Sequence, residues 1–347
     1  MKKFKDYRND FNINKQEKIS VVGAGGWGTA VALVLADSGF ENIKMWAHEP
    51  AVVEEINSLR SNEIFLAGAK IPQQITATAD PAELEDSRII FMAVPTQYIR
   101  EVVRLFGDSL KNQFIVNLSK GIERKSLMRI SELLGESAGI PPSNYCVLSG
   151  PSHAEEVVRR MPTTVVAASD NKDFARAVQS LFTANYFRVY SSEDVTGCEF
   201  GGSLKNVIAI AAGMIDGIGL GDNTKAALIT RGLAEITRLG TKLGADSFTF
   251  SGLSGLGDLL VTANSRHSRN RYVGEQIGRG KSLNAVSGKM QMVAEGVHTT
   301  ESAYQLGRKA GVELPITEQL YRILFEGVDP VEALDELMTR SNKREWW

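Results

Sequence analysis

A single lysine interrupts a run of small and apolar residues, and both its type and its place could do chemistry. Lys205 lies within residues 194–215, whose apolar side chains recur at helical spacing. Its helical face also carries Cys198, Gly202 and Ala209, which are all small. Buried lysines are rare, and burial favours the neutral amine, which brings the group close to proton transfer at neutral pH. The pattern indicates a general acid or base. The alternative is a lysine that reaches solvent or forms a structural ion pair.

Two further residues could place charge near such a lysine. Asp258 belongs to the glycine-rich segment 251–262, just ahead of an apolar turn. It could cap a helix or lie in its first turn, and its other role would be to hold and polarise a lysine ammonium. Lys120 directly follows an apolar strand, on the side of the sheet where α/β proteins bind ligands. A surface lysine is the alternative there.

An arginine-rich segment indicates an anion site. Residues 265–271 read SRHSRNR, and guanidinium forks match the oxygens of phosphate and carboxylate groups. A solvated basic loop explains the composition as well. No aromatic residues alternate with the arginines, which argues against a nucleic-acid surface.

A glycine-rich turn near the N-terminus predicts a dinucleotide site. The apolar strand 19–22 leads into Gly23-x-Gly25-x-x-Gly28 and then into a helical pattern over 29–38. Gly23 would allow the tight turn, Gly25 would let a pyrophosphate approach the backbone, and Gly28 would let the helix pack on the strand. The helix N-terminus would then offer N–H groups to the anion. A glycine turn without a ligand is the alternative.

Strands and helices alternate through the first half of the chain, which predicts a doubly wound, mostly parallel sheet. Expected strands are 19–22, 42–47, 87–94, 114–118, 145–148 and 163–168, and expected helices are 29–38, 50–60, 99–110 and 126–134. After about Tyr190 only helical patterns follow, and Ser191 with Asp194 could begin the first as a capping box. Expected helices there are 194–215, 226–243, 301–309, 316–325 and 330–338.

The expected fold class is therefore α/β, an N-terminal Rossmann-type doubly wound sheet followed by an all-helical C-terminal domain. We expect a polar extension over 1–17, a dinucleotide-binding domain over 18–192 and a helical substrate-binding domain over 193–347. The net charge of −2 predicts no general attraction to nucleic acid or to an anionic membrane. Two cysteines fit a reducing cytoplasm, and four scattered histidines predict no metal site.

Together these segments resemble the bacterial-type NAD(P)-dependent glycerol-3-phosphate dehydrogenase family over about residues 18–327. The motifs that carry the resemblance are GAGGWGTA (23–30), LSKGIE (118–123), LSGPSHAEEV (148–157), GGSLKNVIAIAAGMIDG (201–217), SGLSGLGDLLVT (251–262), SRNR (268–271) and VAEGV (293–297). The resemblance implies the reversible reduction of dihydroxyacetone phosphate to sn-glycerol 3-phosphate, the backbone of phospholipids. Reductases of the ketopantoate or 3-hydroxyacid type are the rival enzymes, and a nucleotide sensor that has lost its chemistry is the rival of another class.

The resemblance also assigns roles to individual residues. Lys205 matches the catalytic lysine, and Asp258 matches the aspartate beside the substrate. The substrate-contacting positions match Lys120, Gly150, Ser152, Ser268, Arg269 and Asn270, of which Arg269 and Asn270 would hold the phosphate. Besides the glycine turn, the cofactor-contacting positions match Gly26, Trp27, His48, Lys120, Ala154, Arg269, Val293 and Glu295. Many members of the family have serine at Gly26 and phenylalanine at His153.

Cofactor choice should depend on the end of the second strand. NAD-selective sites place an acid about 20 residues beyond the glycines, where this chain has His48 followed by Glu49. A histidine there does not repel the additional phosphate of NADP, so we expect NADPH to be preferred and NAD to work. The alternative is that Glu49 turns towards the ribose and favours NAD, since no arginine is adjacent to hold a 2′-phosphate. We expect no metal, no nucleic acid and no membrane insertion. The family makes a homodimer plausible.

Overall fold

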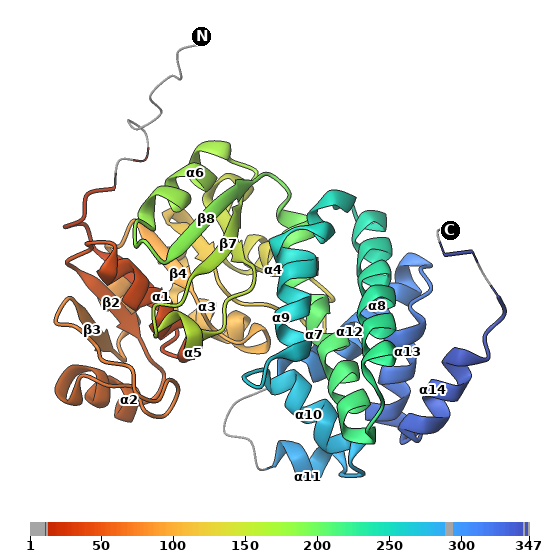
Figure 1. The fold of residues 1–347 in the computed structure, drawn as a ribbon. Helices are drawn as coiled ribbons and strands as arrows, with labels where there is room; N and C mark the ends of the chain where they lie inside the picture. Colours follow the sequence, from red (N-terminus) through yellow and green to blue (C-terminus); the bar gives the residue numbers. More distant parts are fainter. Residues whose placement is uncertain (1–10, 12, 289–293, 343, 346–347) are drawn as a thin grey trace.

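The structure is a computed structural model that describes residues 11, 13–288, 294–342 and 344–345. Its N-terminal part, on the left in Figure 1, is built on a β-sheet flanked by helices. The sheet has eight strands in the order β3-β2-β1-β4-β5-β6-β7-β8. The strands are β1 (Ile19–Val22), β2 (Ile43–Trp46), β3 (Ile75–Thr78), β4 (Ile89–Met92), β5 (Phe114–Asn117), β6 (Tyr145–Ser149), β7 (Thr163–Ala168) and β8 (Phe187–Ser192). Within these residues only β6 and β7 pair antiparallel. The doubly wound, mostly parallel sheet is confirmed.

Strand β1 marks the position where the strand order reverses. It pairs with β2 on one side and with β4 on the other, and Val22 lies level with both Trp46 and Met92. The carboxyl ends of these strands therefore share one edge, with a crevice between the loops that follow β1 and β4. Ligands of open α/β sheets bind in that crevice.

Helices cover both faces of the sheet. They are α1 (Gly26–Asp37), α2 (Pro50–Glu54, continued by a π-helical turn, Glu55–Leu59), α3 (Ile99–Phe106), α4 (Ile130–Ala138), α5 (Ala154–Val157) and α6 (Lys172–Leu181). Val21 and Phe91 point into one core with α1 and α6. Val22 and Ile90 point into a second core with α3 and α4. Burial on both faces explains why these strands read as continuous apolar runs.

The C-terminal part contains helices and no strands among its described residues, and it packs around α7 (Val195–Ile218). The other helices are α8 (Asp222–Lys242), α9 (Asp258–Asn264), α10 (Arg269–Gly278), α11 (Leu283–Ser287), α12 (Glu295–Ala310), α13 (Pro315–Tyr321) and α14 (Pro330–Met338). Gly213 on α7 and Gly274 on α10 bring two backbones into contact, because a Cβ at either would overlap a carbonyl oxygen of the other helix. No helix in the described ranges has both the length and the apolar character needed to span a membrane.

Several elements differ from the expectation. Strands β3 and β8 and helix α6 were not predicted, and α4 begins at Ile130 rather than at residue 126. The capping box that starts at Ser191 is wrong, since β8 includes Ser191 and Asp194 itself caps α7 by accepting the N–H of Gly197 at 2.8 Å. The arginine-rich segment is only partly a loop, because α10 begins at Arg269.

Candidate active site

Three charged side chains that lie far apart in the sequence meet where the sheet faces the helical part. The Lys205 ammonium forms a salt bridge with Asp258 Oδ1 and donates to Thr262 Oγ1 at 2.8 Å. The other carboxylate oxygen, Oδ2 of Asp258, accepts from Lys120 Nζ at 2.6 Å. Asp258 is 1% exposed and Lys205 6% exposed, so solvent screens this cluster weakly. The carboxylate thus joins the two lysines.

Burial sets the proton affinity of this lysine. Desolvation lowers the pKa of Lys205 to about 7, and the positive charge of Lys120 acts in the same direction. The Asp258 carboxylate opposes both by favouring the ammonium. Lys205 can therefore both give and take a proton near neutral pH. This geometry agrees with a general acid or base and differs from a lysine that reaches solvent.

The small residue Gly202 on α7 lets this helix pack closely against the edge of the sheet. A Cβ at Gly202 would lie 2.8 Å from Ser149 Oγ and 3.5 Å from Lys120 Cγ. Gly202 therefore sits against the ends of two strands, and Lys205 follows on the next turn. Asp258 is the first residue of α9, as the first-turn expectation proposed, and Thr262 lies one turn later on the same face.

The loop after β6 contributes backbone oxygen to the same place. Gly150 adopts a positive φ of +139°, and its carbonyl oxygen accepts from Lys120 Nζ at 3.1 Å. The Ser152 hydroxyl donates to that oxygen at 2.9 Å. Lys120 was predicted from one motif and Gly150 and Ser152 from another, and together they form one hydrogen-bonded group with Asp258.

The arginine-rich segment ends at the start of a helix. Ser268 caps α10, since its hydroxyl accepts from the Arg271 N–H at 3.1 Å. Arg269 is exposed in the first turn, while Asn270 is buried. Asn270 Oδ1 accepts from the Gly296 N–H at 2.9 Å, which ties α10 to α12. Such an N-terminus with an arginine suits a phosphate group.

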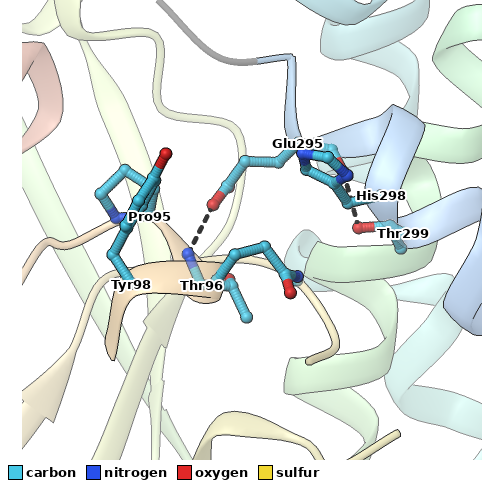
Figure 2. A pocket seen from close by; sticks show the side chains of 8 residues that line it. Pro95, Thr96, Tyr98, Glu295, His298 and Thr299 are labelled. Atoms are coloured by element: carbon cyan, nitrogen blue, oxygen red, sulfur yellow. Dashed lines mark hydrogen bonds between the residues drawn. The ribbon is translucent and has the colours of Figure 1, made fainter. Parts of the chain in front are cut away.

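Glu295 bridges the two parts of the molecule on the other side of the site. Its Oε1 accepts from the Thr96 N–H at 2.8 Å, across a small cavity of about 40 Å³ (Figure 2). The cavity is lined by Pro95, Thr96, Gln97, Tyr98, Gly121, Glu295, His298 and Thr299. Burial raises the pKa of Glu295, while the Thr96 amide and the positive charges of Arg269 and Lys120 lower it. The carboxylate lies between the loop after β4 and the N-terminus of α12.

The glycine turn has the shape that a dinucleotide phosphate needs. Gly23 has a φ of +110°, and a Cβ at Gly28 would overlap the Gly23 carbonyl oxygen. A Cβ at Gly25 would meet nothing within 4 Å. No side chain caps α1 and no acid lies in its first turn, so its N–H groups remain available to an anion. These residues fit a bound pyrophosphate.

The remaining cofactor positions are distributed around this turn. A Cβ at Gly26 would lie 2.8 Å from the Phe65 carbonyl oxygen and 3.8 Å from Ala154 Cβ, so a neighbouring loop occupies the space that a serine would need. The Trp27 indole N–H is buried and has no partner. His48 is exposed, with its ring 6.2 Å from that of Trp46. Val293 lies outside the described residues.

Sequence reasoning missed two polar groups of the site. Thr262 accepts from the central lysine, and the Thr96 amide donates to Glu295. Thr262 could have been found, because it lies four residues after Asp258 and shares its helical face. The Thr96 contact uses a backbone N–H, for which the sequence has no signal. Within the described residues, no group of three or more His, Cys, Asp or Glu could hold a metal ion.

Comparisons with known proteins match both the N-terminal and the C-terminal part of the chain. Residues 18–175 match the family model of the NAD-dependent glycerol-3-phosphate dehydrogenase N-terminus, and residues 194–335 match that of its C-terminus. A glycerol-3-phosphate dehydrogenase (NAD(P)+) of Carboxydothermus hydrogenoformans is 52% identical over 330 residues, which cover 94% of this chain and 98% of the relative. One of Geobacillus kaustophilus is 52% identical over 332 residues, which cover 95% and 96%.

Solved structures agree with the sequence matches. The glycerol-3-phosphate dehydrogenase of Coxiella burnetii has a TM-score of 0.88 at 36% identity, covering 94% of this chain and 100% of that one. A ketopantoate reductase family structure from Ralstonia eutropha has a TM-score of 0.58 at 15% identity, covering 91% and 99%, and shares the fold alone.

Proposed function

This chain belongs to the NAD-dependent glycerol-3-phosphate dehydrogenase family, and we propose that Lys205 carries the proton transfer of the family's reaction. The protein is an NAD(P)-dependent oxidoreductase that acts on a CH–OH group and interconverts dihydroxyacetone phosphate and sn-glycerol 3-phosphate. The observation that supports this role is the buried ammonium of Lys205 between Asp258 and Thr262. Burial in this cluster lowers the pKa of Lys205 to about 7, so its ammonium can release a proton at neutral pH.

In ketone reduction, the reduced nicotinamide supplies the hydride when it is bound. Lys205 donates its ammonium proton to the carbonyl oxygen, which becomes the hydroxyl group of the product. In the reverse direction the neutral amine of Lys205 takes that proton from the alcohol. Asp258 orients the Lys205 ammonium and stabilises its charge, and Thr262 accepts a second N–H from it. The two contacts hold the lysine side chain in one orientation. Helices and the loops at the strand ends enclose the site. This enclosure excludes water, which strengthens each of these hydrogen bonds and ion pairs.

We assign the substrate contacts around this lysine. Arg269 and Asn270, with Ser268 at the helix N-terminus, hold the phosphate. Their support is the capped start of α10, which combines a helix N-terminus with a guanidinium. Lys120, Gly150 and Ser152 contact the remainder of the substrate, because they already form one group with Asp258.

We assign the cofactor to the crevice between β1 and β4. Its contacts would be Gly23, Gly25, Gly26, Trp27, Gly28, His48, Lys120, Ala154, Arg269, Val293 and Glu295. The open space at Gly25 and the uncapped start of α1 support the pyrophosphate position. His48, two residues after the end of β2, would lie by the ribose, and for that reason we propose a preference for NADPH, with NADH also accepted.

At the level of the whole chain, we propose that residues 18–192 bind the cofactor and that residues 193–347 bind the substrate. We further propose that the protein is cytoplasmic and that it forms a homodimer. Light scattering on the purified protein tests the homodimer directly, and a monomeric mass would refute it.

One assay tests the reaction itself. We expect the purified protein to consume NADPH rapidly with dihydroxyacetone phosphate, and to consume little with ketopantoate or without substrate. Faster turnover of ketopantoate than of dihydroxyacetone phosphate would indicate that the protein is a reductase of the ketopantoate type. NADPH binding without turnover of either substrate would favour the sensor.

A further inference from the structure

One imidazole beside the catalytic cluster has no role in the chemistry described so far. His153 directly follows Ser152 and precedes α5. Its Nε2 atom is buried and has no hydrogen-bond partner. Burial and the positive charge of Lys205 keep the pKa of His153 below its ordinary value, so the ring is neutral at physiological pH. A buried polar atom without a partner is unusual and is explained when a ligand supplies the partner.

The surroundings of this ring place it at the proposed substrate site. Lys205 and Asp258 both lie close enough to affect its proton affinity. The His153 ring also lies 6.1 Å from that of His267, at an angle of 52°. His267 directly precedes Ser268, the cap of α10. The two rings therefore join the loop that carries Ser152 to the segment where we place the substrate phosphate.

Several other features of the site leave His153 Nε2 for the ligand. Ser152 uses its hydroxyl as a donor to Gly150, and Lys205 directs two of its three N–H groups to Asp258 and Thr262, which leaves the third for the carbonyl oxygen. The neighbouring position, Ala154, has no polar side chain. An imidazole nitrogen can donate to or accept from an oxygen, whereas a phenylalanine ring at this position could do neither.

We propose that His153 is a substrate-binding residue of this chain, whose Nε2 completes a hydrogen bond with an oxygen of the bound triose phosphate. The oxygen belongs either to the phosphate or to the free primary hydroxyl. This assignment rests on the proposed function, since it requires dihydroxyacetone phosphate as the substrate. The contact adds affinity and orientation to the substrate without taking part in proton transfer.

The test compares wild-type protein with His153→Phe, which keeps a ring of similar shape next to His267. We expect KM for dihydroxyacetone phosphate to rise by about 5- to 20-fold, as for the loss of one hydrogen bond. We expect kcat to change less than about 3-fold, because the ring contributes no proton, and KM for NADPH to stay unchanged. The melting temperature should not fall, because phenylalanine removes a buried nitrogen that has no partner. His153→Gln keeps a donor and an acceptor and should recover part of the loss.

Two substrate analogues identify the oxygen. Hydroxyacetone phosphate lacks the free hydroxyl, and dihydroxyacetone lacks the phosphate. The loss in kcat/KM caused by His153→Phe should disappear for the analogue that lacks the partner oxygen and persist for the other. An unchanged KM for dihydroxyacetone phosphate, or an equal loss with all three compounds, would overturn the assignment. Inactivity of the wild-type protein with dihydroxyacetone phosphate would instead refute the proposed function.

Discussion

At the residue scale, the two lysines and one aspartate of the site act as a single unit. Two ammonium groups share one carboxylate in a place with little solvent, so the unit has an excess positive charge. Desolvation is the main cause of the Lys205 pKa of about 7; the Asp258 carboxylate opposes it by favouring the ammonium, and the positive charge of Lys120 acts with desolvation. The same positive charge suits a substrate that carries a phosphate and develops negative charge on its carbonyl oxygen.

The pH dependence of the reaction should follow this group. Ketone reduction needs the Lys205 ammonium, so kcat/KM should be constant below about pH 7 and fall above it, and alcohol oxidation should show the opposite trend. Asp258 raises the pKa of Lys205, so Asp258→Asn should move the break in the reduction profile to lower pH. The wild-type and Asp258→Asn profiles are measured with the same substrate, so ionisation of the substrate affects both equally and cannot cause a difference between them. A break at the same pH in both proteins would contradict the coupling.

Arg269 allows a test of phosphate binding with a control in the same segment. Arg269→Ala should cost about 1.5–3 kcal/mol in kcat/KM for dihydroxyacetone phosphate, because a charge-assisted contact is lost. The loss should shrink for dihydroxyacetone, which has no phosphate. Arg266 is exposed three residues earlier, and Arg266→Ala should leave both values unchanged. Equal losses with both substrates would argue against the phosphate role of Arg269.

Cofactor choice is a second property of single residues. If His48 contacts the cofactor at the 2′ position of the ribose, kcat/KM should be higher for NADPH than for NADH. His48→Ala should reduce this preference, because the imidazole can donate a hydrogen bond to the additional phosphate of NADP and a methyl group cannot. A preference for NADH in the wild-type protein would assign the ribose contact to Glu49 instead.

Much of the site was predictable from residue type. Lys205, Asp258 and Lys120 are charged residues in segments that are otherwise small or apolar, so a shared role was foreseeable. Contacts of hydroxyl and backbone groups, such as those of Thr262 and the Thr96 amide, were not foreseeable, because these groups occur throughout the chain. The role that we propose for His153 was likewise not foreseeable, because it is inferred from the unpartnered nitrogen of this ring and from its contact with His267.

At the element scale, helix starts determine where anions can bind. Helix α1 begins without a side-chain cap, while α10 begins with Ser268 as its cap and Arg269 in its first turn. The first start was predictable from its glycines. The second was not, because three arginines in one short segment suggested a solvated loop and obscured the serine cap. Strands β3 and β8 were missed for a related reason, since as edge strands they have weaker apolar patterns.

The start of α1 makes one element-scale prediction. Gly26→Ser would place a Cβ 2.8 Å from the Phe65 carbonyl oxygen, so the neighbouring loop would have to move. We expect the free protein to lose about 1–3 kcal/mol of stability, as is usual for overpacking, and to bind NADPH more weakly. Thermal melting and a fluorescence titration with NADPH measure the two effects. Unchanged melting with tighter NADPH binding would show that the loop accommodates serine without cost.

At the scale of the whole molecule, the site exists only where the sheet and the helical part meet. Asp258 on α9 pairs with Lys120 from the sheet edge, and Glu295 on α12 accepts from Thr96 in the loop after β4. The architecture of each part was predictable from its alternating or helical pattern. Their relative placement was not, because it depends on the close packing of Gly202 against Ser149 and Lys120.

The central claim is that this junction holds Lys205 as the proton donor of the reaction. Lys205→Ala should lower kcat for reduction of dihydroxyacetone phosphate by at least ~10²-fold, the usual contribution of a positioned acid, while NADPH binding survives. Lys225, which pairs with Asp216 away from this cluster, gives a matched control, and Lys225→Ala should keep near-normal turnover. The most direct measurement is kcat for the two variants beside the wild type, with NADPH affinity determined in parallel. A large loss for Lys205→Ala alone is the predicted result, and near-normal turnover in that variant would contradict the account.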